Sequence, residues 1–333
     1  MPKLCVMPGD GIGQEVIPAA VQVMQAVLPA LEIVEADAGW ATFERTGASV
    51  PDETLATIRD CGAGLFGAVQ SPSHKVEGYR SAILTMRQSL GLYANIRPVR
   101  CLPNVSPRDD IDMIVVRENS EGLYSQRETS DGETAIAERV ITRTASERIG
   151  RKSAELMQTL NRQKLTIVHK ANVLPLTDGL FRDAVRAVIT DKVASGEIEV
   201  DELLVDVAAL KLLEDPTRFD VIVTTNLFGD ILSDAAAHWG GGLGYAPSLN
   251  WGDNCAVAEP VHGSAPDIAG QGIANPIAAI LSGAMLVRYV WNDLASAEQI
   301  ENAIDQVLRT QPELLVRSEG ATKRITRAIL DSL

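Results

Sequence analysis

The chain is short of basic residues, and this shortage excludes two classes of partner. Its 333 residues include 30 Lys and Arg against 44 Asp and Glu, a formal net charge of −14. Nucleic acids and anionic membranes attract positively charged surfaces, so neither is expected as the main partner. A small anionic substrate remains compatible with this charge, because a local group of arginines is enough to bind it.

Cysteines and long apolar runs are also scarce. The four cysteines lie far apart and form no C-x-x-C pair, which disfavours a disulfide framework or a zinc site and favours a reducing compartment. No basic region followed by an apolar stretch opens the sequence. The longest apolar run, 276–291, is interrupted by Ser282 and Arg288 and is too short to span a bilayer. We therefore expect a cytoplasmic protein.

The dinucleotide-binding fingerprint is incomplete. The stretch "GDGIGQE" follows the apolar run "KLCVM" and precedes an apolar segment typical of a helix, as in a strand, glycine turn and helix. The fingerprint G-x-G-x-x-G needs a third glycine, but its place is taken by Gln14 or Val16, depending on which glycine begins the motif. The N-terminal turn alone therefore does not identify a Rossmann fold.

Short β-branched runs alternate with longer amphipathic segments along the chain. This alternation predicts an α/β architecture with helices packed against a sheet. The predicted strands are "KLCVM", "AGLFGAV", "DMIVV", "LTIVHK", "VDELLVDV" and "FDVIVTTN", and the predicted helices are 14–31, 52–60, 144–160, 177–194, 229–238, 275–291 and 297–308.

Two stretches have the composition of domain joints. Residues 95–110 carry three prolines, and residues 240–254 are rich in glycine. They predict a large domain of residues 1–99 plus 248–333 and a small domain of residues 100–247. A cleft between two such domains is the usual place for a ligand.

The strongest chemical signal is "NLFGDILSD". Asp230 and Asp234 lie four residues apart in a predicted helix, so both carboxylates project from one face. Two like charges at this spacing are unfavourable unless a positive group lies between them. Mg²⁺ or Mn²⁺ would meet that need, and a solvated helix face is the alternative. The apolar flanks, and Gly229, which permits a close approach, favour the metal.

Two further charged residues lie in apolar surroundings. Asp206 is inside "LLVDVAAL", which predicts a buried carboxylate in a strand, and Lys170 ends the apolar strand "TIVHK". Buried carboxylates are rare unless they are paired or bind metal, and buried lysines can act as bases. Each alone would be typical of a structural ion pair, whereas together they indicate a site.

Three arginines and a loop complete the candidate set. Arg87, Arg97 and Arg117 are suited to bind carboxylates in bidentate fashion, although surface ion pairs are the alternative; Tyr124 alone is more typical of packing. The segment 259–276, rich in Gly, Ala and Pro, cannot form a helix or a regular strand. Such a loop can place backbone N–H groups against a phosphate and an aspartate against a ribose diol.

Taken together and in this order, these segments resemble the β-decarboxylating dehydrogenase family, which includes isocitrate, 3-isopropylmalate, homoisocitrate and tartrate or D-malate dehydrogenases. The resemblance covers nearly the whole chain, from "PGDGIGQE" through "YANIRP", "VRENSEG-Y", "KAN" and "NLFGDILSD" to "HGSAPDIAGQGIANP". It implies a two-domain fold with a mixed central sheet flanked by helices, not a Rossmann fold. It also implies a large cofactor-binding domain and a small domain that carries dimer contacts and metal ligands.

The resemblance also implies residue roles. In this family the catalytic lysine and one metal ligand come from the partner subunit, which implies a homodimer or a higher assembly with shared sites. The matching positions are Tyr124 and Lys170 for the catalytic pair, Ser81, Arg87, Arg97 and Arg117 for the substrate, and Asp206, Asp230 and Asp234 for the metal.

The loop that binds the adenosine part of the cofactor in this family matches residues 261–275. NAD-using members place an acidic residue where this chain has Asp267, whereas NADP-using members commonly have Lys followed by Tyr. Ile268 follows here, and a 2′-phosphate would meet like charge at Asp267, so NAD is implied. The implied cofactor-binding residues are His262, Gly263, Ser264, Ala265, Asp267, Ile268 and Asn275.

The substrate is indicated less directly. Isocitrate enzymes usually have Ser-x-Asn before the first arginine, whereas this chain has Ser81 and Ile83. The runs "GAVQSPSHKVEGY" and "KANVLPLTDGLF" look most like homoisocitrate dehydrogenases. His74, Lys75 and Arg80 are candidates to reach a distal carboxylate, with an exposed loop as the alternative.

Other substrates and other functions are also compatible with these residues. Isocitrate, 3-isopropylmalate and tartrate or D-malate are alternative substrates. A regulatory subunit without activity is a remote alternative, because such a subunit can lose the catalytic or metal-binding residues that are present here, and a plain anion-binding module would not need them all. The segment 312–320, "PELLVRSEG", departs from the family's usual "PDLGG" turn, which puts the local cofactor-side contacts in doubt.

Overall fold

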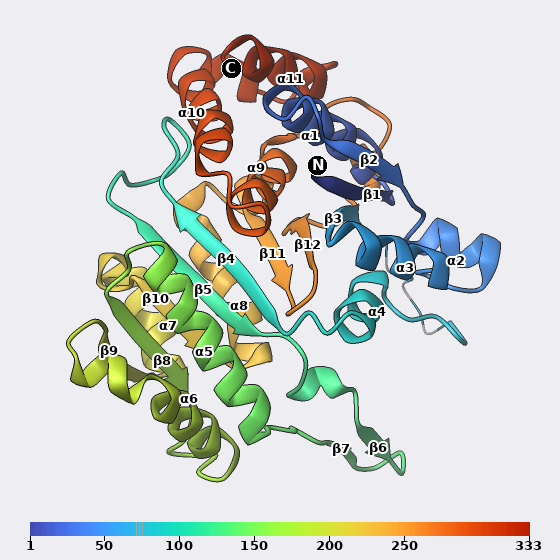
Figure 1. Cartoon of the computed structure of the whole chain (residues 1–333). Coiled ribbons are helices and arrows are strands. Elements are labelled where there is room, and N and C mark those ends of the chain that lie inside the picture. The colour runs from blue at the N-terminus through green and yellow to red at the C-terminus, as the bar shows by residue number, and fades with distance from the viewer. Residues whose placement is uncertain (71, 73, 75) are drawn as a thin grey trace. The chain divides into compact units, whose positions relative to one another are not determined.

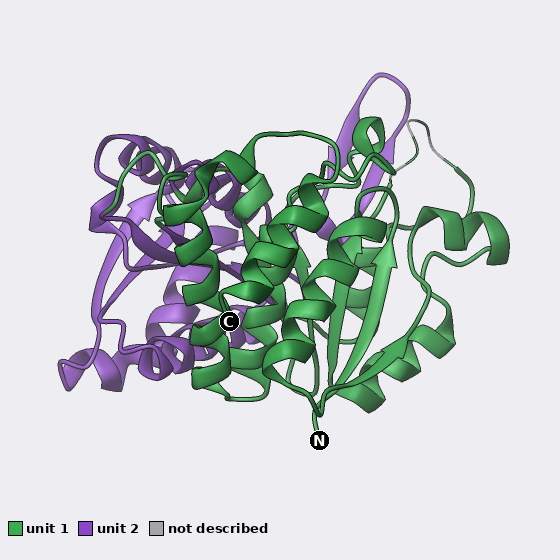
Figure 2. Ribbon diagram, turned by 90° about the horizontal axis from the view of Figure 1, so that it is seen from above, with its two compact units in different colours: residues 1–92, 101–109, 240–333 green, residues 93–100, 110–239 purple. Residues whose placement is uncertain are grey.

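The alternation of apolar runs and amphipathic segments produces strands and helices throughout the computed structural model, which describes residues 1–333 except 71, 73 and 75. The described chain divides into two units, coloured separately in Figure 2. Unit 1 comprises residues 1–92, 101–109 and 240–333, and unit 2 comprises residues 93–100 and 110–239. The sequence predicts 93–99 in the large domain and 101–109 and 240–247 in the small one, and the structure groups these three segments the other way.

In unit 1, helices accompany a mixed sheet (Figure 1). Its described strands follow the order β2-β1-β3-β12-β11; all neighbours are parallel except the antiparallel pair β11–β12. The strands are β1 Lys3–Gly9, β2 Glu32–Glu35, β3 Ala63–Ala68, β11 Pro247–Trp251 and β12 Ala256–Pro260. The helices are α1 Gly13–Val27, α2 Trp40–Thr46, α3 Asp52–Cys61, α4 Ala82–Ser89, α9 Ile277–Met285, α10 Leu294–Thr310 and α11 Ala321–Asp331.

The long apolar run of the sequence forms the centre of the helical packing in unit 1. All nine residues of α9 are buried, and α9 packs against α1 and α10. The contact with α1 is close at Gly283, where an added Cβ would lie 2.6 Å from the sulfur of Met24. The run therefore contributes to the protein core. No helix in the described part of the chain is long and apolar enough to cross a membrane.

Unit 2 also contains parallel and antiparallel strand pairs. Its described strands follow the order β4-β5-β10-β8-β9, with β4 antiparallel to β5 and the remaining pairs parallel. They are β4 Ala94–Arg100, β5 Asp112–Glu118, β8 Lys164–His169, β9 Glu199–Leu204 and β10 Val221–Thr224. The helices are α5 Arg143–Thr159, α6 Thr177–Ala194, α7 Val205–Glu214 and α8 Asn226–Ala237.

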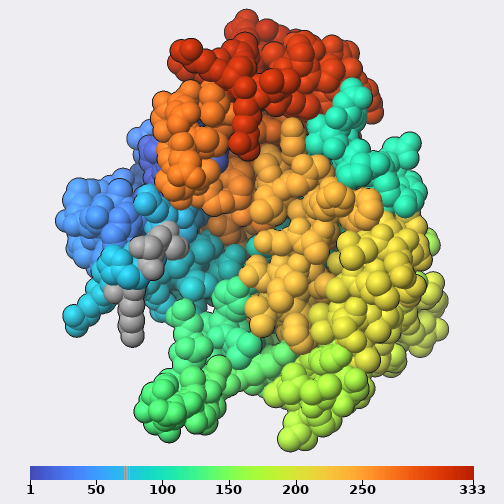
Figure 3. Space-filling model, turned by 180° about the vertical axis from the view of Figure 1, so that it is seen from behind, coloured from blue at the N-terminus to red at the C-terminus, as the bar shows by residue number. Residues whose placement is uncertain are grey.

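A separate two-stranded ribbon extends from unit 2. Strands β6 Glu128–Ser130 and β7 Ala135–Ala137 pair in antiparallel fashion, and all six residues are exposed. The ribbon protrudes in the ribbon and space-filling views (Figures 1 and 3). With this ribbon set aside, both units show the predicted α/β architecture of mixed sheet and flanking helices, which is confirmed.

Two local predictions need correction. Residues 95–100, the first part of the segment expected as a joint, form β4, which pairs with β5 from Ala94 to Arg100; the chain passes between the two units at 100/101 and 109/110, in the rest of that segment. The run "VDELLVDV", expected as one strand, ends as a strand at Leu204 and continues as helix α7. Asp206 therefore lies in the first helical turn, where a carboxylate is favoured by the helix dipole, and it is not a buried strand residue.

The N-terminal glycine turn is fixed by a buried carboxylate. Asp10 accepts backbone hydrogen bonds from Trp40 (2.7 Å) and Ala41 (3.1 Å) at the start of α2, and from Gln70 (2.9 Å) after β3. Gly39, with φ +120°, leaves room for this carboxylate, since an added Cβ would lie 2.6 Å from its Oδ2. One side chain thus joins three chain segments of unit 1.

Replacing Asp10 by alanine is expected to lower the free energy of unfolding by about 2–4 kcal/mol, because three backbone N–H groups lose a charged acceptor. Urea unfolding of the variant measures the change. Asp37→Ala is the matched control: Asp37 is also acidic, but its carboxylate makes an exposed ion pair with Arg45, so a change within about 0.5 kcal/mol is expected. Equal losses in the two variants would contradict the role of Asp10.

Candidate functional site

The two aspartates of α8 share a guanidinium group. The helix begins at Asn226, so Asp230 and Asp234 lie one turn apart in its second and third turns, on one face. Arg97 on β4 places Nη1 2.6 Å from Oδ1 of Asp234 and Nη2 3.5 Å from Oδ1 of Asp230. Arg97 also donates to Asn95 and Ser233, both at 2.7 Å. The positive charge that this carboxylate spacing requires is thus present within the chain.

A second arginine binds the same helix from β5. The side chain of Arg117 is only 1% exposed and forms an ion pair with Asp230. Its Nε and Nη2 donate to Oδ1 of Asn226 at 3.1 and 2.8 Å. Gly229 makes this possible, because an added Cβ would lie 2.6 Å from Cγ of Arg117. The close approach that the sequence associated with a metal is therefore made by Arg117.

Tyr124 completes this cluster. Its hydroxyl donates to Oδ2 of Asp230, and the guanidinium carbon of Arg117 lies 4.9 Å from the centre of its ring. Burial, and then the hydrogen bond to Asp230, raise the pKa of the Tyr124 phenol. We name Arg97, Arg117, Tyr124, Asp230 and Asp234 the arginine–carboxylate cluster. It brings together five of the residues predicted from sequence.

Lys170 and Asp206 form a separate pair in unit 2. Lys170 directly follows β8 and makes an ion pair with Asp206 at the start of α7. Their side chains are 25% and 60% exposed, so neither is the buried group that the sequence predicted. The hydrogen bond from Lys170 lowers the pKa of the Asp206 carboxyl. Both side chains thus reach solvent as a pair.

The three predicted metal ligands do not meet within one chain. Among the described residues, no three His, Cys, Asp or Glu side chains form a group that could hold a metal ion. Asp230 and Asp234 nevertheless fit a hard divalent cation in their chemistry, since carboxylate oxygens on one helix face are suitable donors. A single chain supplies two such donors in one place, and Asp206 presents a third, exposed carboxylate elsewhere on unit 2.

Arg87 is held within unit 1 by two residues that sequence reasoning missed. Its Nε donates to Oδ1 of Asn250 at 2.9 Å, and its Nη2 lies 3.2 Å from Oε1 of Glu259. Asn250 also donates to Glu259 at 2.8 Å. Asn250 lies on β11 and Glu259 on β12, so only the pairing of these strands brings them together. No sequence spacing links them to Arg87.

The predicted cofactor loop lies beside the N-terminal glycine turn. The backbone N–H of Ile12 donates to the carbonyl of Ser264 at 2.9 Å, and an added Cβ at Gly11 would collide with that carbonyl. Glu15 accepts the N–H of Gly270 at 2.6 Å. The loop contains a short 3₁₀ turn, Pro266–Ile268, preceded by Ala265 with φ +39°. It is otherwise irregular, as predicted for 259–276 after β12.

The C-terminal end of the loop is anchored. The backbone N–H of Thr322, at the start of α11, donates to Gly272 at 3.1 Å, and its hydroxyl donates to Ala274 at 2.6 Å. Asn275 accepts the N–H of Ile277 and thereby joins the loop to α9. The atypical segment 312–320 ends at Gly320, two residues before this anchor. The C-terminal helix therefore contacts the loop despite the unusual turn.

Two side chains in the loop have contrasting surroundings. The Asp267 carboxylate is exposed and has no hydrogen bond or ion pair among the residues that the structure describes. Burial lowers the pKa of His262, whose Nδ1 lies 3.0 Å from the carbonyl oxygen of Gly263.

Beside the loop is a cavity of about 640 Å³, lined in part by Gly270, Gly272 and the basic residues Lys323 and Arg327.

The segment before Arg87 places its predicted residues in different surroundings. Ser81 precedes α4, and its carbonyl accepts the N–H of Thr85. Ile83 is half-buried and packs against the core of unit 1. Arg80 donates to Gln88, and His74 is exposed. Lys75, named with these two as a candidate for a distal carboxylate, lies outside the described residues.

Comparison with known proteins shows the family to which this chain belongs. The family model "Isocitrate/isopropylmalate dehydrogenase" matches residues 3–329. The chain belongs to the isocitrate/isopropylmalate dehydrogenase family. It is 51% identical over 332 residues to an isocitrate/homoisocitrate dehydrogenase of Thermus thermophilus, covering 99% of this chain and 98% of the relative. It is 47% identical over 302 residues to a homoisocitrate dehydrogenase of Methanocaldococcus jannaschii, covering 87% and 86%.

The solved structures agree with the family assignment. A crystal structure of isocitrate dehydrogenase from Methylococcus capsulatus matches with a TM-score of 0.92 and 39% identity, covering 100% of this chain and 99% of the other. The predicted family resemblance and its fold, a mixed sheet flanked by helices, are confirmed. The chain is thus a member of a dehydrogenase family.

Part of the supporting set could have been found from sequence. Asn226 lies four residues before Asp230, so the motif "NLFGD" already places both on one helix face. Ser233 lies next to Asp234 in the same motif. Asn95, two residues from Arg97 on β4, shares its face of the strand. Asn250 and Glu259 carry no such signal, as their role arises only from strand pairing.

Replacing Gly229 by alanine tests the close approach of Arg117. The new Cβ would lie 2.6 and 2.7 Å from Cγ and Cβ of Arg117, so the arginine must shift away from Asn226 and Asp230. We expect the free energy of unfolding, measured in urea, to fall by about 1–3 kcal/mol.

Gly179→Ala is the matched control in the same unit. It is a helical glycine of α6 at which an added Cβ meets nothing within 4 Å. There alanine should raise the free energy of unfolding by about 0.4–1 kcal/mol. A gain in stability at both positions would show that Arg117 does not depend on Gly229.

Proposed function

We propose that this protein catalyses the metal-dependent, NAD-linked oxidative decarboxylation of a 2-hydroxy acid with a β-carboxylate, namely homoisocitrate to 2-oxoadipate. The observation that carries the proposal is the arginine–carboxylate cluster. It offers two arginines for substrate carboxylates, two aspartates suited to a divalent metal and a protonated tyrosine. Because the chain belongs to a dehydrogenase family, we assign these residues to a dehydrogenase reaction.

Each side chain of the set has a defined task in this reaction. Arg97 and Arg117, joined by Arg87, bind the substrate carboxylates and orient C2. Lys170 accepts the proton of the 2-hydroxyl as hydride leaves C2. After CO₂ is lost, Tyr124 donates its proton to the enol carbon. The Tyr124 phenol is protonated at neutral pH, as this task requires, and burial shifts its pKa further in that direction.

Asp230, Asp234 and Asp206 would hold Mg²⁺ or Mn²⁺. The metal, when bound, lowers the pKa of the substrate hydroxyl and stabilises the negative charge that develops during decarboxylation. Asp206 and Lys170 lie apart from the other two aspartates in unit 2, so one chain does not present a complete set. A partner's Asp206 and Lys170 would complete it in a homodimer.

A surface of unit 2 supports this assembly. The helices α7 and α8 pack against each other and expose four large apolar side chains, 36–66% exposed: Val207, Leu210, Leu213 and Ile231. Asp206, on the first turn of α7, adjoins this surface. A second copy of the chain would bury the apolar side chains and bring Asp206 towards a neighbouring site.

The cofactor assignment rests on Asp267. Its exposed, unpaired carboxylate is suited to accept two hydrogen bonds from an adenosine ribose diol, and it would repel a 2′-phosphate. Lys323 and Arg327 in the neighbouring cavity argue against NAD, because their positive charges could attract the 2′-phosphate of NADP. We favour NAD because Asp267 belongs to the loop itself.

The substrate assignment rests on position 83 and on the relatives. Ile83 packs into the core and provides no amide for the third carboxylate of isocitrate. The relatives named above act on isocitrate and homoisocitrate, or on homoisocitrate, according to their names. Isocitrate is therefore the chief alternative, followed by 3-isopropylmalate and D-malate or tartrate. A regulatory subunit is disfavoured, because Tyr124, Lys170 and the three aspartates are all present.

NADH formation with Mg²⁺ tests the activity across homoisocitrate, isocitrate, 3-isopropylmalate, D-malate and tartrate. We expect kcat/KM for homoisocitrate to exceed the others by about tenfold or more, equivalent to about 1.4 kcal/mol of transition-state preference. Chelation of the metal by EDTA should abolish turnover, and added Mg²⁺ should restore it.

Three results would each revise a different part of the proposal. A lead for isocitrate would show that another residue replaces the missing amide at position 83. A preference for NADP would show that Lys323 and Arg327 outweigh Asp267. If the protein binds Mg²⁺ but turns over none of the five substrates, the hypothesis of a regulatory subunit would be favoured.

The double variant Leu210→Asp/Leu213→Asp tests the dimer surface. We expect the wild-type mass in solution to be twice the 35.7 kDa of one chain or a multiple of that dimer, and the variant to be monomeric and inactive. Light scattering after size-exclusion chromatography measures the mass. Leu294→Asp, at an exposed leucine of α10 in unit 1, is the control and should keep the wild-type mass. An active wild-type monomer would contradict shared sites.

A further inference from the structure

A buried carboxylate near Lys170 has no task in the proposed reaction. Asp178, in the first turn of α6, has a side chain with no exposed area. Its Oδ2 accepts the backbone N–H of Lys170 at 2.6 Å. The carbonyl of Lys170 accepts the N–H groups of Val173 and Leu174 at 3.0 and 2.9 Å. Asp178 thus binds the residue at which β8 ends and the following turn begins.

The partner of this carboxylate is Arg139, whose side chain is 15% exposed. Its Nη2 lies 2.8 Å from Oδ1 of Asp178 and donates to Oγ1 of Thr225 at 3.0 Å. Its guanidinium carbon lies 4.4 Å from the ring centre of Phe228. Thr225 directly precedes α8, and Phe228 lies two residues before Asp230. Arg139 therefore contacts α8 at its start and in its first turn.

The backbone around Arg139 adds a third connection. The carbonyl of Val140 accepts the N–H of Gly122 at 2.8 Å, two residues before Tyr124. Thr142 donates its N–H and its hydroxyl to Glu121, each at 2.9 Å. The segment that carries Arg139 is thus hydrogen-bonded to the turn that carries Tyr124.

We propose that the buried Arg139–Asp178 pair is a positioning device that holds the segments of Lys170, Tyr124 and the α8 aspartates in one arrangement. The proposal rests on the function proposed above, since it assigns these segments their catalytic tasks. Among the residues that the structure describes, neither charge has a second ion-pair partner, and burial lowers the pKa of Arg139. Loss of one member leaves the other charged and buried, so each group depends on the other.

The alternative is that Arg139 and Asp178 only stabilise the fold and do not position the catalytic segments. Replacing a buried ion pair by apolar or neutral groups of similar volume is often neutral for stability, whereas removing one partner is strongly destabilising. Stability alone therefore does not separate the two roles. A variant that lacks both charges does, because it removes the Arg139–Asp178 ion pair and the hydrogen bond to Thr225 without leaving a buried charge unpaired.

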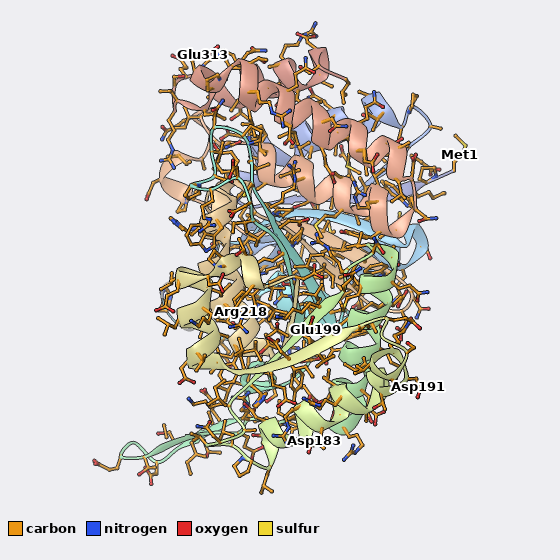
Figure 4. All side chains as sticks on the ribbon, turned by 90° about the vertical axis from the view of Figure 1, so that its left-hand side faces the viewer. Met1, Asp183, Asp191, Glu199, Arg218 and Glu313 are labelled. Atoms are coloured by element: carbon orange, nitrogen blue, oxygen red, sulfur yellow. The ribbon has the colours of Figure 1, made fainter. Side chains whose placement is uncertain are left out.

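The test compares Asp178→Asn, Arg139→Met and the double variant in the full-length protein. Asp183→Asn is the matched control, because Asp183 lies on the same helix in an exposed ion pair with Arg182, at the molecular surface in Figure 4. Measured are kcat and KM for the substrate, the melting temperature, and hydrogen exchange of the segments 170–174 and 225–230 without substrate.

Both single variants should lose stability and should lower kcat by about tenfold or more, while KM changes less than about threefold. Proton transfer is sensitive to displacements of the order of 1 Å, whereas the substrate arginines keep their own partners. The double variant should regain the melting temperature but not kcat. All three should exchange faster at both segments, and Asp183→Asn should match the wild type.

Recovery of kcat together with the melting temperature in the double variant would overturn the positioning role. So would unchanged kcat in the single variants, or an equal loss in Asp183→Asn. If the wild type turns over none of the substrates, the proposed function fails by itself. Hydrogen exchange then still decides the inference: unchanged exchange at 170–174 and 225–230 in all variants would overturn it.

Discussion

Charge compensation at helix α8 is the constraint on which the site depends. Asp230 and Asp234 project from one face and repel each other, and Arg97 and Arg117 supply the opposing charge from the adjacent strands β4 and β5. Burial makes this compensation necessary, because an ionised side chain with 1% exposure is costly without a partner. The glycine at 229, the amide of Asn226 and the hydroxyl of Ser233 all serve to bring the arginines to the carboxylates.

Unit 2 presents its reactive groups as two separate sets. In the arginine–carboxylate cluster Arg97 and Arg117 are buried and Asp234 reaches solvent, whereas Lys170 and Asp206 reach solvent elsewhere as a pair. A single chain therefore presents the two arginines with the aspartates of α8 in one place and the Lys170–Asp206 pair in another. Such a division is understandable if two copies of the chain contribute to each site, and the apolar side chains exposed on α7 and α8 are consistent with that arrangement.

Unit 1 provides support of a different kind. Apart from one 3₁₀ turn, the loop predicted to bind the cofactor has no regular structure of its own. Its contacts are with the glycine turn after β1, the start of α11 and the first turn of α9. Close packing against the carbonyl of Ser264 explains why the sequence has glycine at position 11. The third glycine of the dinucleotide fingerprint is unnecessary here, since the turn serves as a support for the loop.

The sequence by itself determined the α/β class, most helices and strands, and the residues of both reactive sets, because periodicity and local motifs depend on neighbours along the chain. It also indicated Asn226 through its helical spacing from Asp230. Only the tertiary structure decided that β4 is a strand, that Asp206 begins a helix, that Arg117 occupies the space left by Gly229, and that Glu259 and Asn250 hold Arg87. These facts depend on strand pairing and packing between segments far apart in sequence, for which no local pattern carries a signal.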